Sequence, residues 1–243
     1  MYKKYLTQFL FILSLFIVGV FASTNSKSDE DYFISYQVDL KKQELKLYWK
    51  DDNSQILKSL NTLKNWVETK NKRLVFAMNA GMYKKDNSPL GLFIRDGIII
   101  TPLNKRTATG NFYLKPNGVF YVDNNNNAAI CKTEKFINNG NIKYATQSGP
   151  MLVIDGNIHR GFKRGSTSLK IRNGVGLLPN NKLMFVMSKK EINLYDFANY
   201  FKGLGCKNAL YFDGFVSRTY LPEKKWVQTD GNFGVMVGVV ENK

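Results

Sequence analysis

The 243-residue chain has only two cysteines, Cys131 and Cys206, and a single histidine, His159. Zinc sites in proteins are built mainly from cysteine thiolates and histidine imidazoles at short spacings. A zinc site of that kind is therefore effectively excluded, and we expect no cofactor, although a divalent metal is not excluded. The two cysteines could pair in an oxidising compartment, and the sequence leaves that question open.

Sequence motifs of nucleotide binding and of serine hydrolysis are also missing. The chain contains neither G-x-x-x-x-G-K-[ST] nor G-x-G-x-x-G on a strand-to-helix turn, the patterns that cradle phosphates of nucleotides. It has no G-x-S-x-G nucleophile elbow. A triad of Ser148, His159 and an aspartate thus remains only a minor alternative.

Acidic residues are scarce. The chain has 19 Asp and Glu against 35 Lys and Arg, a formal net charge of +16. Such a balance favours acidic partners, namely phosphorylated glycans, membrane surfaces or nucleic acid, although a solvated basic surface explains much of the charge equally well. An exported chain meets little nucleic acid, so we expect a phosphorylated glycan partner, no nucleic acid, and proximity to a membrane surface as a further option.

Long apolar runs are absent apart from one near the start of the chain. Lys3 and Lys4 precede an apolar run from Phe9 to Phe21, and small residues follow, which is the pattern of a secretory signal peptide. The run is short for a membrane-spanning helix of about 20 residues. We therefore predict a signal peptide over 1–22, a disordered lead-in over 23–30 and one domain over 31–243. The predicted location is secreted or periplasmic, with an uncleaved membrane anchor as the alternative.

The remaining sequence is rich in strand patterns. Alternating segments in 31–49 predict a hairpin, and apolar spacing predicts a helix over 54–69 capped by Asp52 or Ser54. A second amphipathic helix follows Asn193 and stops at the glycines after residue 202. Strands outnumber helices, so we predict an α+β fold with a strand-rich mixed, largely antiparallel sheet, which could be barrel-like, and a few packed helices.

Four strand-like segments share one feature. Each is a short apolar run that ends in a polar or charged residue next to a glycine: FAMNAGMY (76–83), ATQSGPML (145–152), LKIRNGVG (169–176) and LYFDGFVS (210–217). A polar side chain at the end of a buried strand is held rigidly, and glycine allows a sharp turn or close approach of a ligand. If these ends converge, they form one pocket lined by Asn79, Ser148, Arg172 and Asp213.

Arg172 and Asp213 are the strongest candidates for chemistry. A buried guanidinium must be paired or face a pocket, and its planar fork suits a phosphate. A carboxylate at a buried strand end can serve as acid, base or nucleophile. The competing interpretation of Asp213-Gly214 is a simple turn, as we expect for Asp96-Gly97 and Asp155-Gly156.

The segment 159–172 contains five Lys and Arg residues, hydroxyl residues and no acid. It suits a phosphate-bearing substrate, although a solvated basic loop explains its outer cations. His159 opens this segment and is a candidate substrate-binding residue.

With these segments in place, the chain resembles the phosphodiester glycosidase domain family, which includes the lysosomal uncovering enzyme, N-acetylglucosamine-1-phosphodiester alpha-N-acetylglucosaminidase. It looks most similar to a bacterial branch of the exopolysaccharide-biosynthesis type. The matching stretches run in one order from Phe76 to Ser217 and include SPLGLFIRDG, GNFYLKPNGVFYV, QSGPMLVIDGNIH and NALYFDGFVS.

The resemblance implies hydrolysis of a sugar 1-phosphodiester at its glycosidic bond. Asp213 and Arg172 would be catalytic, and the family motifs extend to a set of binding residues, namely Asn79, Gly81, Ser148, Gly149, Gly214 and Ser217. Phe215 and Val216 depart from the family pattern, because the uncovering enzyme has glycines after its aspartate. The implied function is an exported hydrolase acting on surface or extracellular glycans. The alternative is a non-catalytic protein that binds anionic polysaccharide during exopolysaccharide production.

Overall fold

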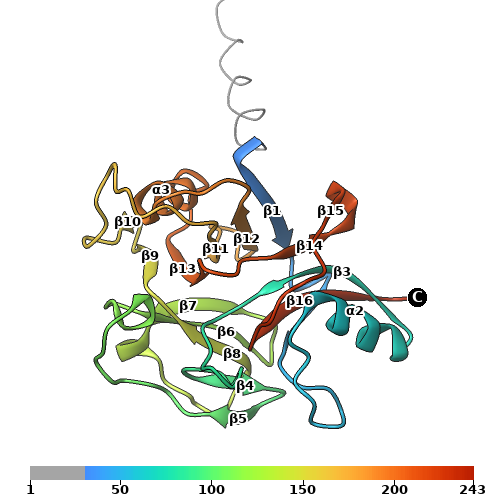
Figure 1. Ribbon diagram of the computed structural model, residues 1–243. Coiled ribbons are helices and arrows are strands. Elements are labelled where there is room, and N and C mark those ends of the chain that lie inside the picture. Colours follow the sequence, from blue (N-terminus) through green and yellow to red (C-terminus); the bar gives the residue numbers. More distant parts are fainter. Residues whose placement is uncertain (1–30) are drawn as a thin grey trace, which may run out of the picture. The chain divides into compact units, whose positions relative to one another are not determined.

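The computed structural model describes residues 31–243, in which residues 32–243 form one compact unit (Figure 1). The predicted signal peptide and lead-in, residues 1–30, lie outside the described residues. In the described part of the chain, no helix is both long and apolar enough to span a membrane.

Three antiparallel sheets make up this unit. Sheet I has the order β1-β12-β11-β13-β9-β10, sheet II β15-β14-β3-β16-β2, and sheet III β5-β4-β8-β6-β7. Every pairing of named strands within residues 31–243 is antiparallel. The strands have the bounds β1 Phe33–Val38, β2 Glu44–Tyr48, β3 Lys72–Asn79, β4 Phe93–Arg95, β5 Ile98–Thr101, β6 Gly118–Asp123, β7 Ala128–Lys132, β8 Ile142–Ser148, β9 Met151–Ile154, β10 Asn157–Ile158, β11 Asn173–Leu177, β12 Leu183–Ser188, β13 Asn208–Asp213, β14 Thr219–Leu221, β15 Trp226–Val227 and β16 Met236–Asn242.

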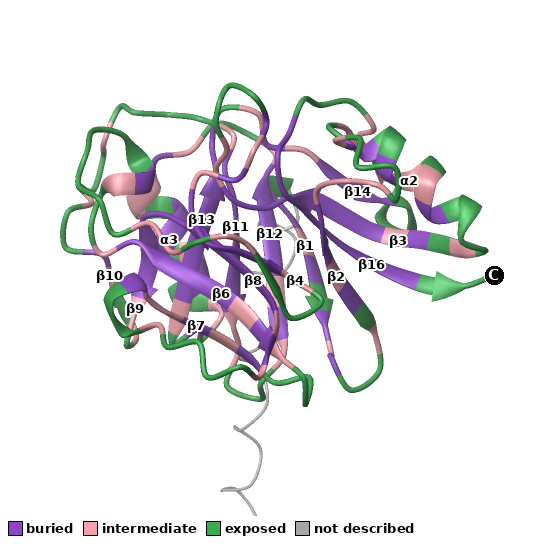
Figure 2. Ribbon diagram, turned by 90° about the horizontal axis from the view of Figure 1, so that it is seen from below, coloured by how far each residue is buried: buried purple, intermediate pink, exposed green. Residues whose placement is uncertain are grey.

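One apolar core joins the three sheets. Phe185 of sheet I, Phe76 of sheet II and Phe120 of sheet III are fully buried in the same cluster, and Phe185 is in ring contact with both. Figure 2 shows the consequence, with buried strands in the interior and exposed loops around them. The predicted strand-rich α+β class is confirmed. The three sheets surround the core and remain separate, and they do not close into a barrel within residues 31–243.

Two α-helices cover the outer faces of two sheets. Helix α3 (Leu194–Gly203) begins where predicted, because the Asn193 side chain accepts a hydrogen bond from the Asp196 backbone N–H at 2.9 Å. Its buried face packs Phe197 and Phe201 with residues of sheet I.

Helix α2 (Leu60–Thr69) begins later than predicted. Its cap is Ser59, which accepts from the Thr62 backbone N–H, and not Asp52 or Ser54. Ser54 and Lys58 both have a φ of 62°, which is incompatible with a right-handed helix over this stretch. The prediction of a helix from residue 54 was therefore wrong at its N-terminus.

The predicted hairpin over 31–49 was also wrong, although both of its strands exist. β1 pairs with β12 in sheet I, whereas β2 pairs with β16 in sheet II. The turn at Asp39 is tight, but the two strands diverge from it into different sheets. Within residues 31–243, short 3₁₀ turns are formed by Asn111–Tyr113 (η1), Thr133–Lys135 (η2) and Pro222–Lys224 (η3).

The two cysteines are separate thiols. Cys131 belongs to β7 and packs in the apolar cluster of sheet III, whereas Cys206 is buried beneath α3 against sheet I. Burial raises the pKa of Cys131 to about 11 and that of Cys206 to about 12. The option of a Cys131–Cys206 disulfide is therefore not realised in this structure.

Candidate functional site

The four strand ends singled out in the sequence come from all three sheets. Asn79 ends β3 of sheet II, Ser148 ends β8 of sheet III, and Asp213 ends β13 of sheet I. Arg172 directly precedes β11, the strand beside β13. All four side chains are buried.

A hydrogen-bond network connects two of the strand ends, Asn79 and Asp213, through a residue that the sequence did not single out, Asn173. The Asn173 amide donates to the backbone oxygen of Asn79 at 2.7 Å and to its side-chain oxygen at 3.0 Å. The Asn173 side-chain oxygen accepts from the Asp213 backbone N–H at 3.0 Å. Asn79 Nδ2 then donates to Asp213 Oδ2 at 3.4 Å, which closes a ring of three residues.

The two oxygens of the Asp213 carboxylate have different environments. Oδ1 accepts from the backbone N–H of Gly214 at 2.6 Å and of Phe215 at 3.0 Å. Oδ2 has only the long contact with Asn79 among residues 31–243. Burial raises the pKa of Asp213, and the three hydrogen bonds partly oppose this effect by stabilising the charged form. Asp213 is 8% exposed, and Oδ2 has fewer protein donors than Oδ1, so it has more capacity to accept a further hydrogen bond.

The backbone distinguishes Asp213-Gly214 from the ordinary Asp-Gly turns. Asp96-Gly97 and Asp155-Gly156 have positive φ at both residues, 52° and 80° in the first and 49° and 80° in the second. These values are typical of two-residue hairpin turns, as the sequence predicted. Asp213 and Gly214 both have φ outside that region. Asp213-Gly214 is therefore not a hairpin turn of this kind, and Asp213 instead closes an Asx turn, in which its Oδ1 accepts from the Phe215 backbone N–H two residues on.

Two serines support the strand ends through their hydroxyl groups. Ser148 Oγ donates to the Phe212 backbone oxygen at 3.0 Å, which ties sheet III to the residue before Asp213. Ser217 Oγ lies 3.1 Å from the backbone oxygens of both Ile171 and Asp213. Both serines thus contact the frame of the site and not the carboxylate itself.

The Arg172 guanidinium donates hydrogen bonds to other groups of the protein. Its Nε donates to the Ile192 backbone oxygen, Nη2 to that of Ser168 (both 2.7 Å) and Nη1 to the Tyr211 hydroxyl at 3.0 Å. Arg172 is 2% exposed and has no acidic partner within 4.0 Å among residues 31–243. Three of its five N–H donors are therefore engaged by the fold, and the geometry favours a positioning and electrostatic role over the direct phosphate contact expected from the sequence.

Arg172 and Tyr211 hold the segment that follows Asp213. A Cβ placed on Gly214 would overlap the Tyr211 hydroxyl and would lie 3.2 Å from Arg172 Nη1. No side chain larger than the hydrogen of glycine therefore fits at position 214. Among the other predicted glycines, Gly81 has a φ of 102°, and a Cβ on Gly149 would lie 2.6 Å from Asn117 Cβ, so both support the backbone of the site.

We expect Gly214→Ala to destabilise the protein by about 1–3 kcal/mol, because the added methyl group overpacks a filled region. It should also lower any activity of the site, since Tyr211 and the backbone donors to Asp213 must shift. Urea unfolding followed by tryptophan fluorescence measures the first effect. Gly203→Ala is the matched control, because a Cβ there meets nothing within 4 Å. Equal unfolding midpoints for the two variants would contradict this explanation.

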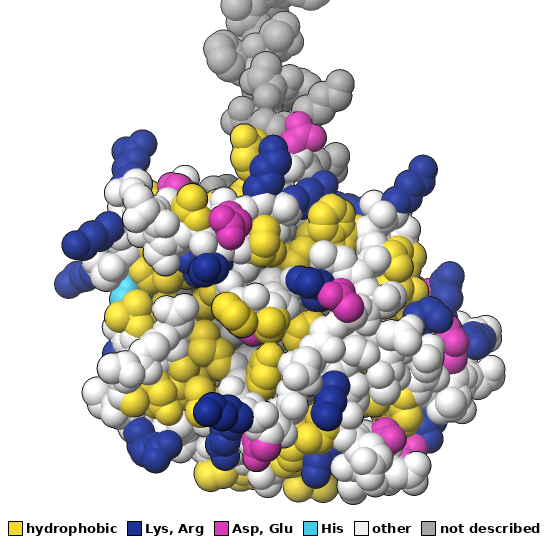
Figure 3. All heavy atoms as spheres, in the orientation of Figure 1, with side chains coloured by type: hydrophobic (Ala, Val, Ile, Leu, Met, Phe, Trp, Pro, Cys, Tyr) yellow, Lys and Arg dark blue, Asp and Glu magenta, His cyan; other side chains and the backbone are white. Residues whose placement is uncertain are grey.

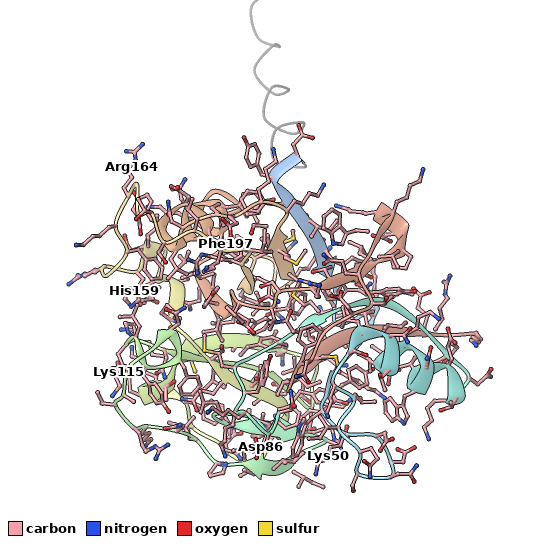
Figure 4. All side chains as sticks on the ribbon, in the orientation of Figure 1. Lys50, Asp86, Lys115, His159, Arg164 and Phe197 are labelled. Atoms are coloured by element: carbon pink, nitrogen blue, oxygen red, sulfur yellow. The ribbon has the colours of Figure 1, made fainter. Side chains whose placement is uncertain are left out.

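His159 lies apart from the Asp213 network. Its Nδ1 accepts from the Gly161 backbone N–H at 3.0 Å, so Nε2 carries the proton and donates to the Lys115 backbone oxygen at 3.1 Å. Burial lowers the pKa of His159, which favours the neutral ring. Figure 4 shows His159 and Lys115 together at one side of the molecule, with Arg164 on the loop above them. Within residues 31–243, no hydrogen bond joins His159 to Ser148 or Asp213.

Sequence reasoning also missed Tyr83. Burial and the charge of Asp213 raise the pKa of Tyr83 to about 12, so its phenol faces the field of the carboxylate and stays protonated at neutral pH. Only the proximity of Tyr83 to the FAMNAGMY motif, of which it is the last residue, could have indicated it. Among residues 31–243, no three His, Cys, Asp or Glu side chains gather in an arrangement that could hold a metal ion.

The model of the phosphodiester glycosidase family matches residues 72–239, a stretch that contains the entire Asp213 network. The chain belongs to the phosphodiester glycosidase family. The "Uncharacterized protein YigE" of Escherichia coli (strain K12) is 34% identical over 215 residues, with 88% of this chain and 84% of that protein covered.

Two solved structures share the fold of this phosphodiester glycosidase family member. The zebrafish N-acetylglucosamine-1-phosphodiester alpha-N-acetylglucosaminidase catalytic domain, auto-inhibited by its pro-peptide, has a TM-score of 0.59 and 14% identity, with 85% of this chain and 83% of that chain covered. A hypothetical protein from Synechocystis has a TM-score of 0.52 and 14% identity, with 86% and 59% covered. At these identities the two structures support the fold alone.

Proposed function

We propose that this phosphodiester glycosidase family member is an exported hydrolase that cleaves the glycosidic bond of sugar 1-phosphodiesters in surface or extracellular glycans. The observation that carries this proposal is the buried Asp213 carboxylate, fixed at Oδ1 by two backbone donors and contacted at Oδ2 by the long hydrogen bond from Asn79. Export rests on the signal-peptide pattern of residues 1–22 alone.

In the proposed reaction, the anomeric carbon–oxygen bond breaks and the phosphate leaves with its bonding electrons. Water supplies the hydroxyl group of the released sugar and a proton, and the second product is a phosphate monoester. A phosphate is a good leaving group, so a strong general acid is unnecessary. This matches a site with one carboxylate at its centre, in contrast to the usual pair of glycosidase carboxylates.

Asp213 acts in its ionised form in this proposal. The Gly214 and Phe215 N–H groups stabilise the charge on Oδ1, while Oδ2 either attacks the anomeric carbon or accepts a proton from the attacking water. Asn79 and Asn173 orient the carboxylate, and Arg172 supplies positive potential from beneath the loop. Ser148 and Ser217 fix the backbone on either side of Asp213.

Phe215 is the residue by which this chain sets its own substrate preference. Its ring is 88% exposed although its backbone N–H contacts the Asp213 carboxylate. A flat aromatic face beside a carboxylate can pack against a sugar ring and exclude water from one side of it. Phe215 therefore gives the surface next to Asp213 an apolar face that glycine at this position would lack.

Hydrolysis of a panel of sugar 1-phosphodiesters in ¹⁸O-labelled water tests the proposed function. We expect free sugar and phosphate monoester as products, with the label in the sugar because the glycosidic bond is cleaved. Label in the phosphate would mean phosphorus–oxygen cleavage and would contradict the glycosidase assignment. Saturable binding of an anionic glycan without any product would favour the alternative, a non-catalytic polysaccharide-binding protein.

A further inference from the structure

A separate cavity opens at the edge of sheet III, where β6 begins and β7 ends. Its volume is about 400 Å³. Its walls combine cationic, acidic and uncharged polar residues, namely Lys105, Lys115, Pro116, Asn117, Lys132, Thr133 and Glu134.

The charge of this lysine cavity is unbalanced. Three lysines face one acid, Glu134, and none of the four takes part in an ion pair within 4.0 Å among residues 31–243. Like charges that line a concave surface focus the potential and raise the local concentration of counter-ions. Figure 3 shows Lys and Arg side chains spread over the visible face of the molecule.

Two buried polar side chains give the cavity hydrogen-bonding capacity beyond charge. Asn117 is 4% exposed, and its Nδ2 donates to the Phe112 backbone oxygen at 2.9 Å. Its Oδ1 accepts no hydrogen bond from residues 31–243 and is available to a ligand hydroxyl. Thr133 Oγ1 accepts from Gln147 Nε2 at 3.1 Å, which leaves the proton of its own hydroxyl to donate. This mixture of cations with an amide and a hydroxyl group suits a sugar that carries an anionic group.

The lysine cavity lies close to the Asp213 network. Gly118 of β6 is aligned with Lys132 of β7 on one side and with Ser148 of β8 on the other. Two strand spacings therefore separate Lys132 from Ser148, which is about 10 Å. Asn117 is in addition packed directly against Gly149. The cavity and the strand end that supports Asp213 are therefore separated by about the length of two sugar units.

His159 acquires a role in this arrangement. The hydrogen bond from its Nε2 fixes the backbone of Lys115, and Phe162 stacks on its ring with the centroids 4.7 Å apart. The histidine thereby braces one wall of the lysine cavity from the start of the basic segment 159–172.

We propose that the lysine cavity binds an anionic sugar unit, with the lysines holding a phosphate or carboxylate group and Asn117 and Thr133 holding hydroxyl groups. This site selects glycans with negative charge on a unit near the one placed at Asp213. The proposal concerns equilibrium binding, so it stands or falls separately from hydrolysis at Asp213.

Isothermal titration calorimetry of the full-length protein at low salt tests the proposal with three probes: glucose 6-phosphate, glucuronate and glucose. We expect at least one of the two anionic sugars to bind at least 10-fold more tightly than glucose, and its affinity to fall with added salt because exposed charges are screened. The Lys105→Ala/Lys132→Ala variant should lose at least 10-fold in that affinity. The matched control is Lys135→Ala/Lys202→Ala, which removes the same charge from exposed positions outside the cavity.

The control variant should stay within about 2-fold of the unmodified protein. Binding of glucose 6-phosphate alone would assign phosphate to the site, and binding of glucuronate would assign a carboxylate. Equal affinity for all three sugars, or equal losses in the two double variants, would overturn the proposal. Circular dichroism of both variants checks that they are folded.

Discussion

Asp213→Asn should abolish hydrolysis of sugar 1-phosphodiesters, with a loss of about 10³-fold or more in kcat. The asparagine can still accept the Gly214 and Phe215 backbone hydrogen bonds through Oδ1, so the geometry of the loop is retained. What is lost is the negative charge at Oδ2, the group that attacks or activates water. Initial rates of phosphate monoester release measure the effect.

Asp155→Asn is the control for this experiment. Asp155 sits in the β9–β10 hairpin turn with a φ of 49°, a conformation that asparagine also adopts, so this variant should keep full activity. If Asp213→Asn retained more than a tenth of the activity while Asp155→Asn behaved normally, Asp213 could not be the base or nucleophile.

The raised pKa of Asp213 gives this prediction a dependence on pH. Because the ionised form is the active one, activity should fall as the pH drops through the raised pKa, at a higher pH than for an ordinary aspartate of pKa about 3.9. The same raised pKa acts on the stability of the folded protein in the opposite direction, because deprotonation that activates the site lowers that stability. A carboxyl group whose pKa is raised by folding destabilises the folded state at neutral pH, since the folded form binds protons more readily. Asp213→Asn should therefore melt at the same temperature as the wild type or higher at pH 7, and any gain should shrink at acidic pH.

The strand ends of the site could be predicted because their causes are local. A short apolar run ending at a polar residue and a glycine is visible in the sequence, and the structure places Asn79, Ser148 and Asp213 at strand ends as expected. The start of α3 was predicted for the same reason, since Asn193 and its capping partner are three residues apart.

Features that depend on distant partners could not be predicted. Asn173 meets Asp213 because the β11–β13 register shifts between Asn173 and Gly174, and a register shift leaves no trace in either strand alone. The prediction of a hairpin over 31–49 was wrong for the same reason. Alternating strands on either side of a tight turn favour a hairpin locally, but β12 and β16, far along the chain, provide better partners in two different sheets.

Arg172 shows how a correct identification can carry the wrong role. The sequence indicated that a guanidinium in an apolar run needs hydrogen-bond partners, and the structure provides them. Its partners are two backbone oxygens and a tyrosine hydroxyl, brought together from Ser168, Ile192 and Tyr211. None of these could be recognised as a partner before the fold was known.

Arg172→Met should therefore lower the free energy of unfolding by about 1–3 kcal/mol. The substitution keeps an apolar side chain of similar length, but it leaves the buried Tyr211 hydroxyl and the Ser168 carbonyl without their donor, whereas the Ile192 carbonyl keeps the Lys170 backbone N–H. Arg164→Met is the matched control. Arg164 is exposed on the loop of the same basic segment (Figure 4), so its replacement should change stability by less than about 0.5 kcal/mol. Urea unfolding at pH 7 compares the two variants.

The pH profile of the folded Arg172→Met fraction separates a positioning role from direct substrate binding. We expect removal of this cation, whose Nη1 lies 3.2 Å from the position of a Cβ on Gly214, to raise the pKa of Asp213, because the charged carboxylate would lose favourable potential. The acidic limb of the kcat profile should then move to higher pH. A variant that unfolds like the wild type, keeps its acidic limb and shows only a raised KM would instead mean that Arg172 binds the phosphodiester directly. Loss of stability together with a shifted limb would establish that Arg172 serves the site through Tyr211, Gly214 and the field at Asp213.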